Sequence, residues 1–125
     1  MRKNESAENY LETIYILSKK LPVVRSVDIA TELNFKKPSV SVAMKHLREK
    51  ELIVVSDAGF ITLTEAGLAQ ATAIFERHTV LTKMFVALGV PENIAAEDAC
   101  QIEHILSEES FAAIKKHFHE KGNAS

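Results

Sequence analysis

The chain has 125 residues, a hydrophobic fraction of 46% and a formal net charge of −2 at pH 7. Its size and composition are those of one ordinary soluble domain or two small subdomains, and no apolar run is long enough to cross a bilayer. Because the N-terminus lacks the apolar segment of a secretory signal and the single cysteine cannot form an internal disulfide, we expect a cytoplasmic protein with no membrane partner.

The first half of the sequence predicts three helices followed by a β-hairpin. Apolar residues at helical spacing predict a helix over residues 6–17, and Ser26 is expected to cap a short second helix. Pro38, at a first helical position, opens a third helix. Two runs rich in β-branched residues, 52–55 and 60–63, are separated by a turn with Asp and Gly and predict the hairpin. Two helices with a short turn and a following hairpin have the form of a winged helix-turn-helix.

Positive charge gathers on the third predicted helix, where residues 36–50 contain five Lys or Arg against one acid. The helical period turns Val40, Met44 and Leu47 towards the core, so the opposite face would meet double-stranded DNA. We expect its cations to contact phosphates, its serines to bond phosphates or base edges, and its proline and valine to touch thymine methyl groups. The predicted DNA-binding residues are Lys36, Lys37, Pro38, Ser39, Ser41, Val42, Lys45 and Arg48.

The second half of the sequence predicts helices alone. We expect a long amphipathic helix over residues 64–88, a second that opens at Pro91 and a last one capped near Ser107. The expected fold is therefore mostly α-helical with a small β-hairpin wing. Its two domains would be a winged helix-turn-helix over residues 1–63 and a helical domain over residues 64–125.

A cysteine, a glutamate and a histidine lie close together in the helix that opens at Pro91. Cys100, Glu103 and His104 stand at i, i+3 and i+4, so on a helix they project from one face. Thiolate, carboxylate and imidazole suit Fe(II), Mn(II), Zn(II), Co(II) or Ni(II) better than Ca(II) or Mg(II), which prefer oxygen. Three ligands are too few for a closed site, and an ordinary buried thiol beside a solvated Glu–His pair is the alternative.

Four segments carry a resemblance to a known family: AENYLETIY at 7–15, KPSVS at 37–41, ERH at 76–78 and EDACQIEH at 97–104. Through them, nearly the whole chain resembles the metal-dependent transcriptional repressors related to the diphtheria toxin repressor and the manganese transport regulators. The resemblance implies a homodimer that binds a pseudo-palindromic DNA operator when metal is bound, and it implies no enzyme. Some members carry an SH3-like C-terminal domain, and we expect this chain to be a short form without one.

The resemblance also implies a larger set of metal ligands. The set matches neither branch of the family, since the iron branch has methionine where Asn9 stands and the manganese branch has an acid where Cys100 stands. Sulfur favours Fe(II), whereas the oxygens of the first helix suit Mn(II). We therefore expect Fe(II) first and Mn(II) next, with other divalent transition metals binding in vitro. The implied ligands are Asn9, Glu12, His78, Cys100, Glu103 and His104.

Two other functions fit the same residues. Cys100 could be a thiol switch in a metal-independent, redox-sensing regulator. Alternatively, the winged helix could serve protein interaction alone. DNA-binding titrations with metal and with peroxide separate these three hypotheses.

Overall fold

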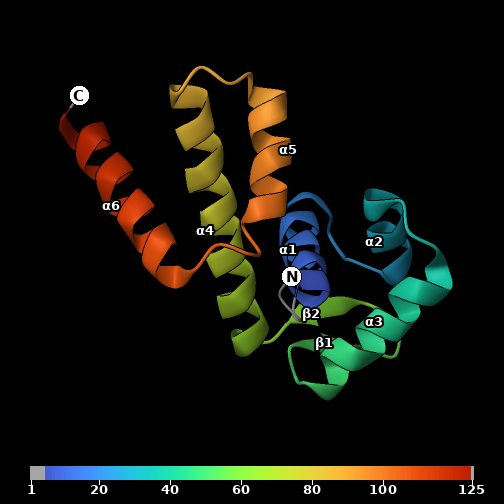
Figure 1. Ribbon diagram of the computed structural model, residues 1–125. Helices are drawn as coiled ribbons and strands as arrows, with labels where there is room; N and C mark the ends of the chain where they lie inside the picture. Colours follow the sequence, from blue (N-terminus) through green and yellow to red (C-terminus); the bar gives the residue numbers. More distant parts are fainter. Residues whose placement is uncertain (1–4, 125) are drawn as a thin grey trace. The chain divides into compact units, whose positions relative to one another are not determined.

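The computed structural model describes residues 5–124, with side chains placed for residues 6–118. Within that part of the chain, helices and a two-stranded hairpin follow one another as Figure 1 shows. The elements are α1 (Glu5–Lys20), α2 (Ser26–Leu33), α3 (Lys37–Glu49), β1 (Ile53–Val55), β2 (Ile61–Leu63), α4 (Glu65–Ala87), α5 (Glu92–Ile102) and α6 (Glu108–Ala124). No described helix is both long and apolar enough to span a membrane.

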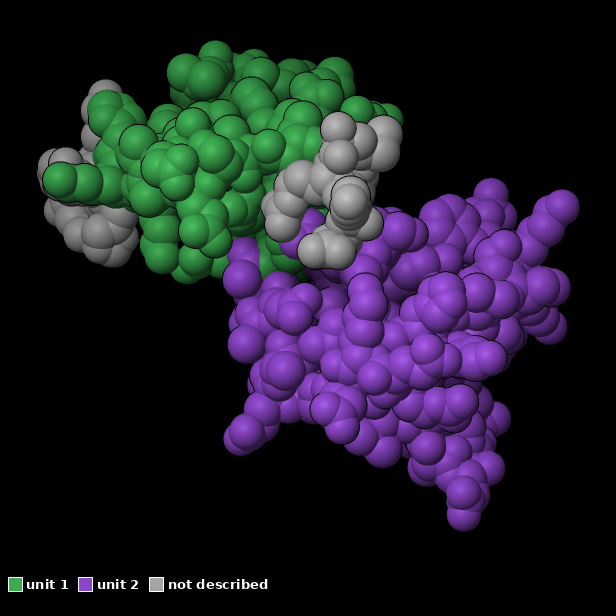
Figure 2. All heavy atoms as spheres, turned by 60° about the horizontal axis from the view of Figure 1, so that its bottom comes forward, with its two compact units in different colours: residues 1–5, 74–125 green, residues 6–73 purple. Residues whose placement is uncertain are grey.

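The chain divides into two compact units between Ala73 and Ile74, a point inside α4. Figure 2 shows them in different colours. The N-terminal unit, residues 6–73, holds α1 to α3, the hairpin and the first turns of α4. The C-terminal unit, from Ile74 onwards, holds the rest of α4 with α5 and α6.

The N-terminal unit is a winged helix-turn-helix built around one apolar core. The core takes side chains from every element of the unit, so each helix has one buried and one exposed face. The predicted inner face of α3 is confirmed, because Val40, Met44 and Leu47 are all buried. Fully burying a side chain of this size contributes about 1.5–3 kcal/mol. The largest fully buried side chains of this core are Leu11, Ile14, Ile29, Val40 and Ile53.

Helix α2 begins one residue earlier than the sequence predicts, and the prediction that Ser26 caps it was wrong. The N-cap is Arg25, whose backbone is extended at φ −125° and ψ 164°. The Arg25 backbone N–H donates to the Asp28 carboxylate at 2.9 Å. A carboxylate at the third helical position accepts a hydrogen bond from the N-cap amide. Asp28 therefore makes Arg25, three residues before it, the N-cap of α2.

A left-handed residue and an aromatic contact hold the turn between α2 and α3. Asn34 has φ 56° and ψ 43°, which asparagine adopts more readily than most residues. The next backbone N–H, that of Phe35, donates to the Ala30 carbonyl at 3.0 Å and closes α2. The Phe35 ring meets the Tyr10 ring of α1 edge to face, with centroids 6.0 Å apart. Burial raises the pKa of the Tyr10 phenol.

The hairpin forms the predicted wing, with strands of three residues each in place of the expected four. β1 and β2 pair antiparallel, and Val54 lies opposite Thr62. At the base of the wing, the Thr64 hydroxyl donates to the Glu51 carbonyl at 2.8 Å and accepts the Gly67 N–H at 3.1 Å. A Cβ on Gly67 would overlap the Leu52 carbonyl oxygen. The first turn of α4 is therefore fastened closely to the start of the wing.

In the C-terminal unit, α5 runs back alongside α4 (Figure 1). Helix α4 ends at Ala87, one residue before the predicted Leu88, and the expected Gly89 follows with φ +101°. The predicted cap of α6 is also confirmed, because the Ser107 hydroxyl accepts the Ser110 N–H at 3.1 Å. The small residues Ala95 and Ala99 form the buried side of α5.

Candidate metal centre and DNA-binding surface

The Glu103 carboxylate lies at the middle of a buried cluster in the C-terminal unit. It is 0% exposed, and His104 beside it is 2% exposed. One carboxylate oxygen, Oε2, lies 3.2 Å from Nδ1 of His78 on α4. The other, Oε1, lies 3.4 Å from Nε2 of His104. Among the described residues, neither oxygen has a hydrogen-bond donor of good geometry.

Glu103 reaches this position because it continues the buried side of α5. Ala95, Ala99 and Glu103 follow one another at four-residue spacing, which places them in one row on a helix. α5 ends at Ile102, but Glu103 keeps helical angles, φ −59° and ψ −26°, and its N–H donates to the Ala99 carbonyl at 3.0 Å. His104 follows in the turn that leads to α6.

Cys100 differs from its two predicted partners in burial. The structure exposes Cys100 but buries Glu103 and His104. Cys100 comes one residue after Ala99, and one residue turns a helix by about 100°, away from the buried row. The helix ends at Ile102, before Glu103, and Cys100 differs from Glu103 and His104 in burial, so the place of Cys100 in a shared ligand set stays a prediction.

The chemistry of the buried cluster fits a divalent transition-metal ion. An ionised carboxylate that has left water costs several kcal/mol of free energy unless a positive charge compensates it. Two imidazole nitrogens face the Glu103 oxygens, and a carboxylate with two imidazoles is a ligand set that suits Fe(II), Mn(II) and Zn(II). Either a protonated imidazole or a bound cation would neutralise Glu103. Within the C-terminal unit, the structure thus brings together the predicted ligands His78, Glu103 and His104.

The remaining predicted ligands lie on α1 of the N-terminal unit and on the exposed side of α5. Glu12 is buried and Asn9 is half-buried on α1. Both are polar side chains on the helix that also carries Leu11 and Ile14 into the apolar core.

Sequence reasoning missed Arg77. Its side chain is 8% exposed, and one guanidinium nitrogen, Nη1, donates to the carbonyls of Glu103 at 3.1 Å and Leu106 at 2.6 Å. The guanidinium carbon also lies 5.1 Å from the centre of the Phe111 ring. Arginine is rarely buried, and the two carbonyls lie more than 25 residues further along the chain, so only its place beside His78 gave a signal.

The predicted DNA-binding face of α3 is exposed. All eight residues predicted to contact DNA are accessible to solvent, whereas the opposite side of the helix is buried. Four of the eight carry positive charge, and no acid interrupts them between residues 36 and 48. A face of this kind can contact the phosphates of a duplex on both sides of a groove.

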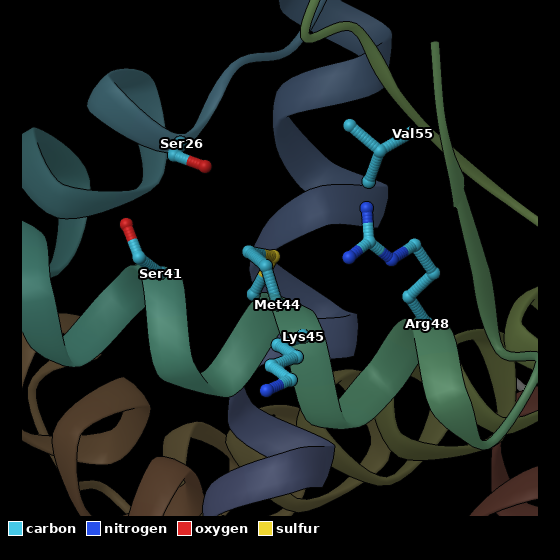
Figure 3. A pocket seen from close by; sticks show the side chains of 6 residues that line it. All are labelled: Ser26, Ser41, Met44, Lys45, Arg48 and Val55. Carbon is cyan, nitrogen blue, oxygen red and sulfur yellow. The ribbon is translucent and has the colours of Figure 1, made fainter.

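A pocket of about 190 Å³ adjoins this face (Figure 3). Ser26 of α2 and Ser41 of α3 lie on one side of it in this view, and on the other side the Arg48 guanidinium lies beside Val55 of the wing. Ser26 was not among the predicted DNA-binding residues. The pocket is lined by Ser26, Ser41, Met44, Lys45, Arg48 and Val55.

A winged helix-turn-helix with a basic exposed helix, in one chain with a buried carboxylate–imidazole cluster, defines a class of DNA-binding regulators that respond to metal. The chain belongs to the family of iron-dependent repressors. Residues 4–59 match the family's N-terminal DNA binding domain, and residues 64–120 match its metal binding and dimerisation domain. The family consists of metal-dependent transcriptional repressors, and nothing in the match supports the alternative of a metal-independent thiol switch at Cys100.

Individual relatives agree with this assignment. The chain is 34% identical to an uncharacterized HTH-type transcriptional regulator of Methanocaldococcus jannaschii, over 90% of this chain and 91% of the relative. It is 32% identical to the transcriptional regulator MntR of Escherichia coli O157:H7, over 90% of this chain and 73% of MntR. A solved manganese-dependent transcriptional repressor in complex with manganese is 26% identical, with a TM-score of 0.79. The match covers 89% of this chain but only 51% of that repressor.

Proposed function

We propose that this protein is a transcriptional repressor, and not an enzyme, that binds a pseudo-palindromic DNA operator as a homodimer when Fe(II) or Mn(II) is bound. The observation that carries the proposal is the fully buried Glu103 carboxylate between His78 and His104. These three residues would hold the ion. A bound ion would neutralise the buried negative charge and tie α4 to the turn between α5 and α6.

Asn9, Glu12 and Cys100 are proposed as further ligands. One carboxylate and two imidazoles leave coordination positions open for other donors. Glu12 would add a carboxylate oxygen, Asn9 an amide oxygen and Cys100 a sulfur. We propose Fe(II) as the favoured metal because sulfur suits it better than Mn(II), and Mn(II) as the next because it accepts the oxygens.

On the DNA side, α3 is proposed as the recognition helix. Lys36, Lys37, Lys45 and Arg48 would contact phosphates, and the serines, Pro38 and Val42 would meet base edges. In a twofold-symmetric dimer, two copies of α3 would read half-sites one helical turn, or a multiple of it, apart. The residues proposed to contact DNA are Lys36, Lys37, Pro38, Ser39, Ser41, Val42, Lys45 and Arg48.

Metal and DNA binding would be coupled by a shift in population. An ion that binds the DNA-competent arrangement better than the other arrangement raises DNA affinity by that difference, about 1.4 kcal/mol for each factor of ten. Glu12 comes from the unit that also carries α3, so its coordination would extend the effect of the ion to the DNA-binding unit.

Anaerobic DNA-binding titrations test the proposal. A duplex selected from a random pool with the Mn(II)-loaded protein is titrated with metal-free protein, with Fe(II), with Mn(II) and with peroxide. We expect either metal to raise the affinity at least about tenfold and a chelator to reverse the gain. If peroxide changes the affinity and neither metal does, Cys100 is a thiol switch. If the protein shows no salt-dependent binding to DNA, the winged helix serves protein interaction instead.

A further inference from the structure

Arg77 joins the C-terminal end of α5 to α4, and we propose that it is a positioning residue for the metal site. Its guanidinium fixes the turn that carries Glu103 and His104, so that both ligands are in place before an ion binds. This inference rests on the proposed function, because it requires an ion to bind at Glu103.

The contacts of Arg77 enclose the turn. Nη1 donates to the Glu103 carbonyl at 3.1 Å and to the Leu106 carbonyl at 2.6 Å. In the sequence, His104 stands between these two residues. The guanidinium also stacks over Phe111, in the first turns of α6. One side chain from α4 thus fixes the end of α5, the turn and the start of α6.

Arg77 and its neighbour His78 hold the same residue at two points. Arg77 binds the main-chain carbonyl of Glu103, and His78 lies against its carboxylate. Consecutive residues of a helix have a fixed relative direction. Arg77 and His78 together therefore set both the position of the Glu103 backbone along α4 and the direction of its side chain. Groups that orient a ligand in this way typically change metal affinity 10–100-fold when they are removed.

The positive charge of Arg77 also stabilises the end of α5 that carries Glu103. Glu103 lies at the C-terminal end of α5, where the helix dipole is negative and a carboxylate is unfavourable. Among the described residues Arg77 forms no ion pair with a carboxylate, and its charge is directed at the carbonyls of this helix end and turn. The buried guanidinium here offsets the negative end of the α5 dipole beside the proposed ligands.

Arginine suits this role better than lysine. A planar guanidinium offers two hydrogens on one nitrogen in fixed directions while its face rests on an aromatic ring. Lysine carries the same charge on a flexible stem without a planar face. The substitution Arg77→Lys therefore keeps the charge and removes the geometry.

The test measures the affinity for Mn(II) by calorimetry and the visible absorption bands of bound Co(II), in wild type and in Arg77→Lys. Arg25→Lys is the matched control, because Arg25 also stacks on a phenylalanine, Phe60 at 4.9 Å, but is exposed in the N-terminal unit. We expect the Mn(II) dissociation constant to rise about 10–100-fold in Arg77→Lys, with altered Co(II) bands, and to stay unchanged in Arg25→Lys.

If Arg77→Lys fails to fold, Phe111→Leu replaces it, since that variant keeps an apolar side chain and removes only the ring beneath the guanidinium. We expect Mn(II) binding to weaken about threefold there, as for the loss of one cation–π contact. A folded variant with wild-type Mn(II) affinity and wild-type Co(II) bands overturns the inference, even if it melts earlier. A wild-type protein that binds neither metal overturns the proposed function as well.

Discussion

Replacing Glu103 by glutamine removes the negative charge at the centre of the proposed metal site and keeps the shape of the side chain. In the metal-free protein the Glu103 side chain is fully buried, and neither carboxylate oxygen has a hydrogen-bond donor of good geometry among the described residues. We therefore expect metal-free Glu103→Gln to be at least as stable as wild type, because a neutral amide costs less to bury than a carboxylate.

The effect should appear when metal is added. A ligand that binds only the native state stabilises it by about 2.7 kcal/mol at 100 times its dissociation constant. For a chain of this length, that energy raises the melting temperature by about 10 °C. Glutamine is a poor metal ligand, so the rise in Glu103→Gln should fall below about 2 °C. Circular dichroism melts with and without Mn(II) measure both values.

Glu76→Gln is the control for this substitution. Glu76 is a carboxylate on the same helix as His78, about half exposed, and it pairs with Lys115 at 2.9 Å. An exposed ion pair contributes at most about 1 kcal/mol, and its loss should leave the metal-dependent rise unchanged. A full Mn(II)-dependent rise in Glu103→Gln would refute our assignment of the site.

Three further substitutions test other parts of the structure. Cys100→Ser should weaken Fe(II) binding more than Mn(II) binding in anaerobic competition, and equal effects would remove Cys100 from the ligand set. Lys45→Ala should reduce the slope of log affinity against log salt by about 1 per protomer, whereas an unchanged slope would mean that Lys45 meets no phosphate. Gly67→Ala should lower the free energy of unfolding by about 1–3 kcal/mol in urea, because its Cβ would overlap the Leu52 carbonyl; undiminished stability would contradict the close approach seen here.

Local sequence patterns predicted those parts of the fold that depend on neighbouring residues. The period of Val40, Met44 and Leu47 gave the buried face of α3, and Gly89 gave the end of α4. Both signals act within a few residues, through helical periodicity and backbone conformation.

The features that the sequence did not predict depend on distant contacts or on a competing local one. Arg25 caps α2 because Asp28 accepts from its amide, and the carbonyl before it, that of Val24, accepts from Ile61 of the wing at 2.8 Å. Arg77 is buried because the turn after α5 brings two carbonyls to it. A spacing of three or four residues could place Cys100 near Glu103, but only the packed position of α5 decides which of them is buried.

The reciprocal effect of DNA on metal binding tests the central claim most directly. Mn(II) affinity is measured by calorimetry on the free protein and on the protein saturated with its selected duplex. Because linkage is reciprocal, DNA should raise Mn(II) affinity by the same factor by which Mn(II) raises DNA affinity, and we predict a factor of at least about ten. Equal Mn(II) affinity in the free and DNA-bound protein would show that the metal does not regulate DNA binding.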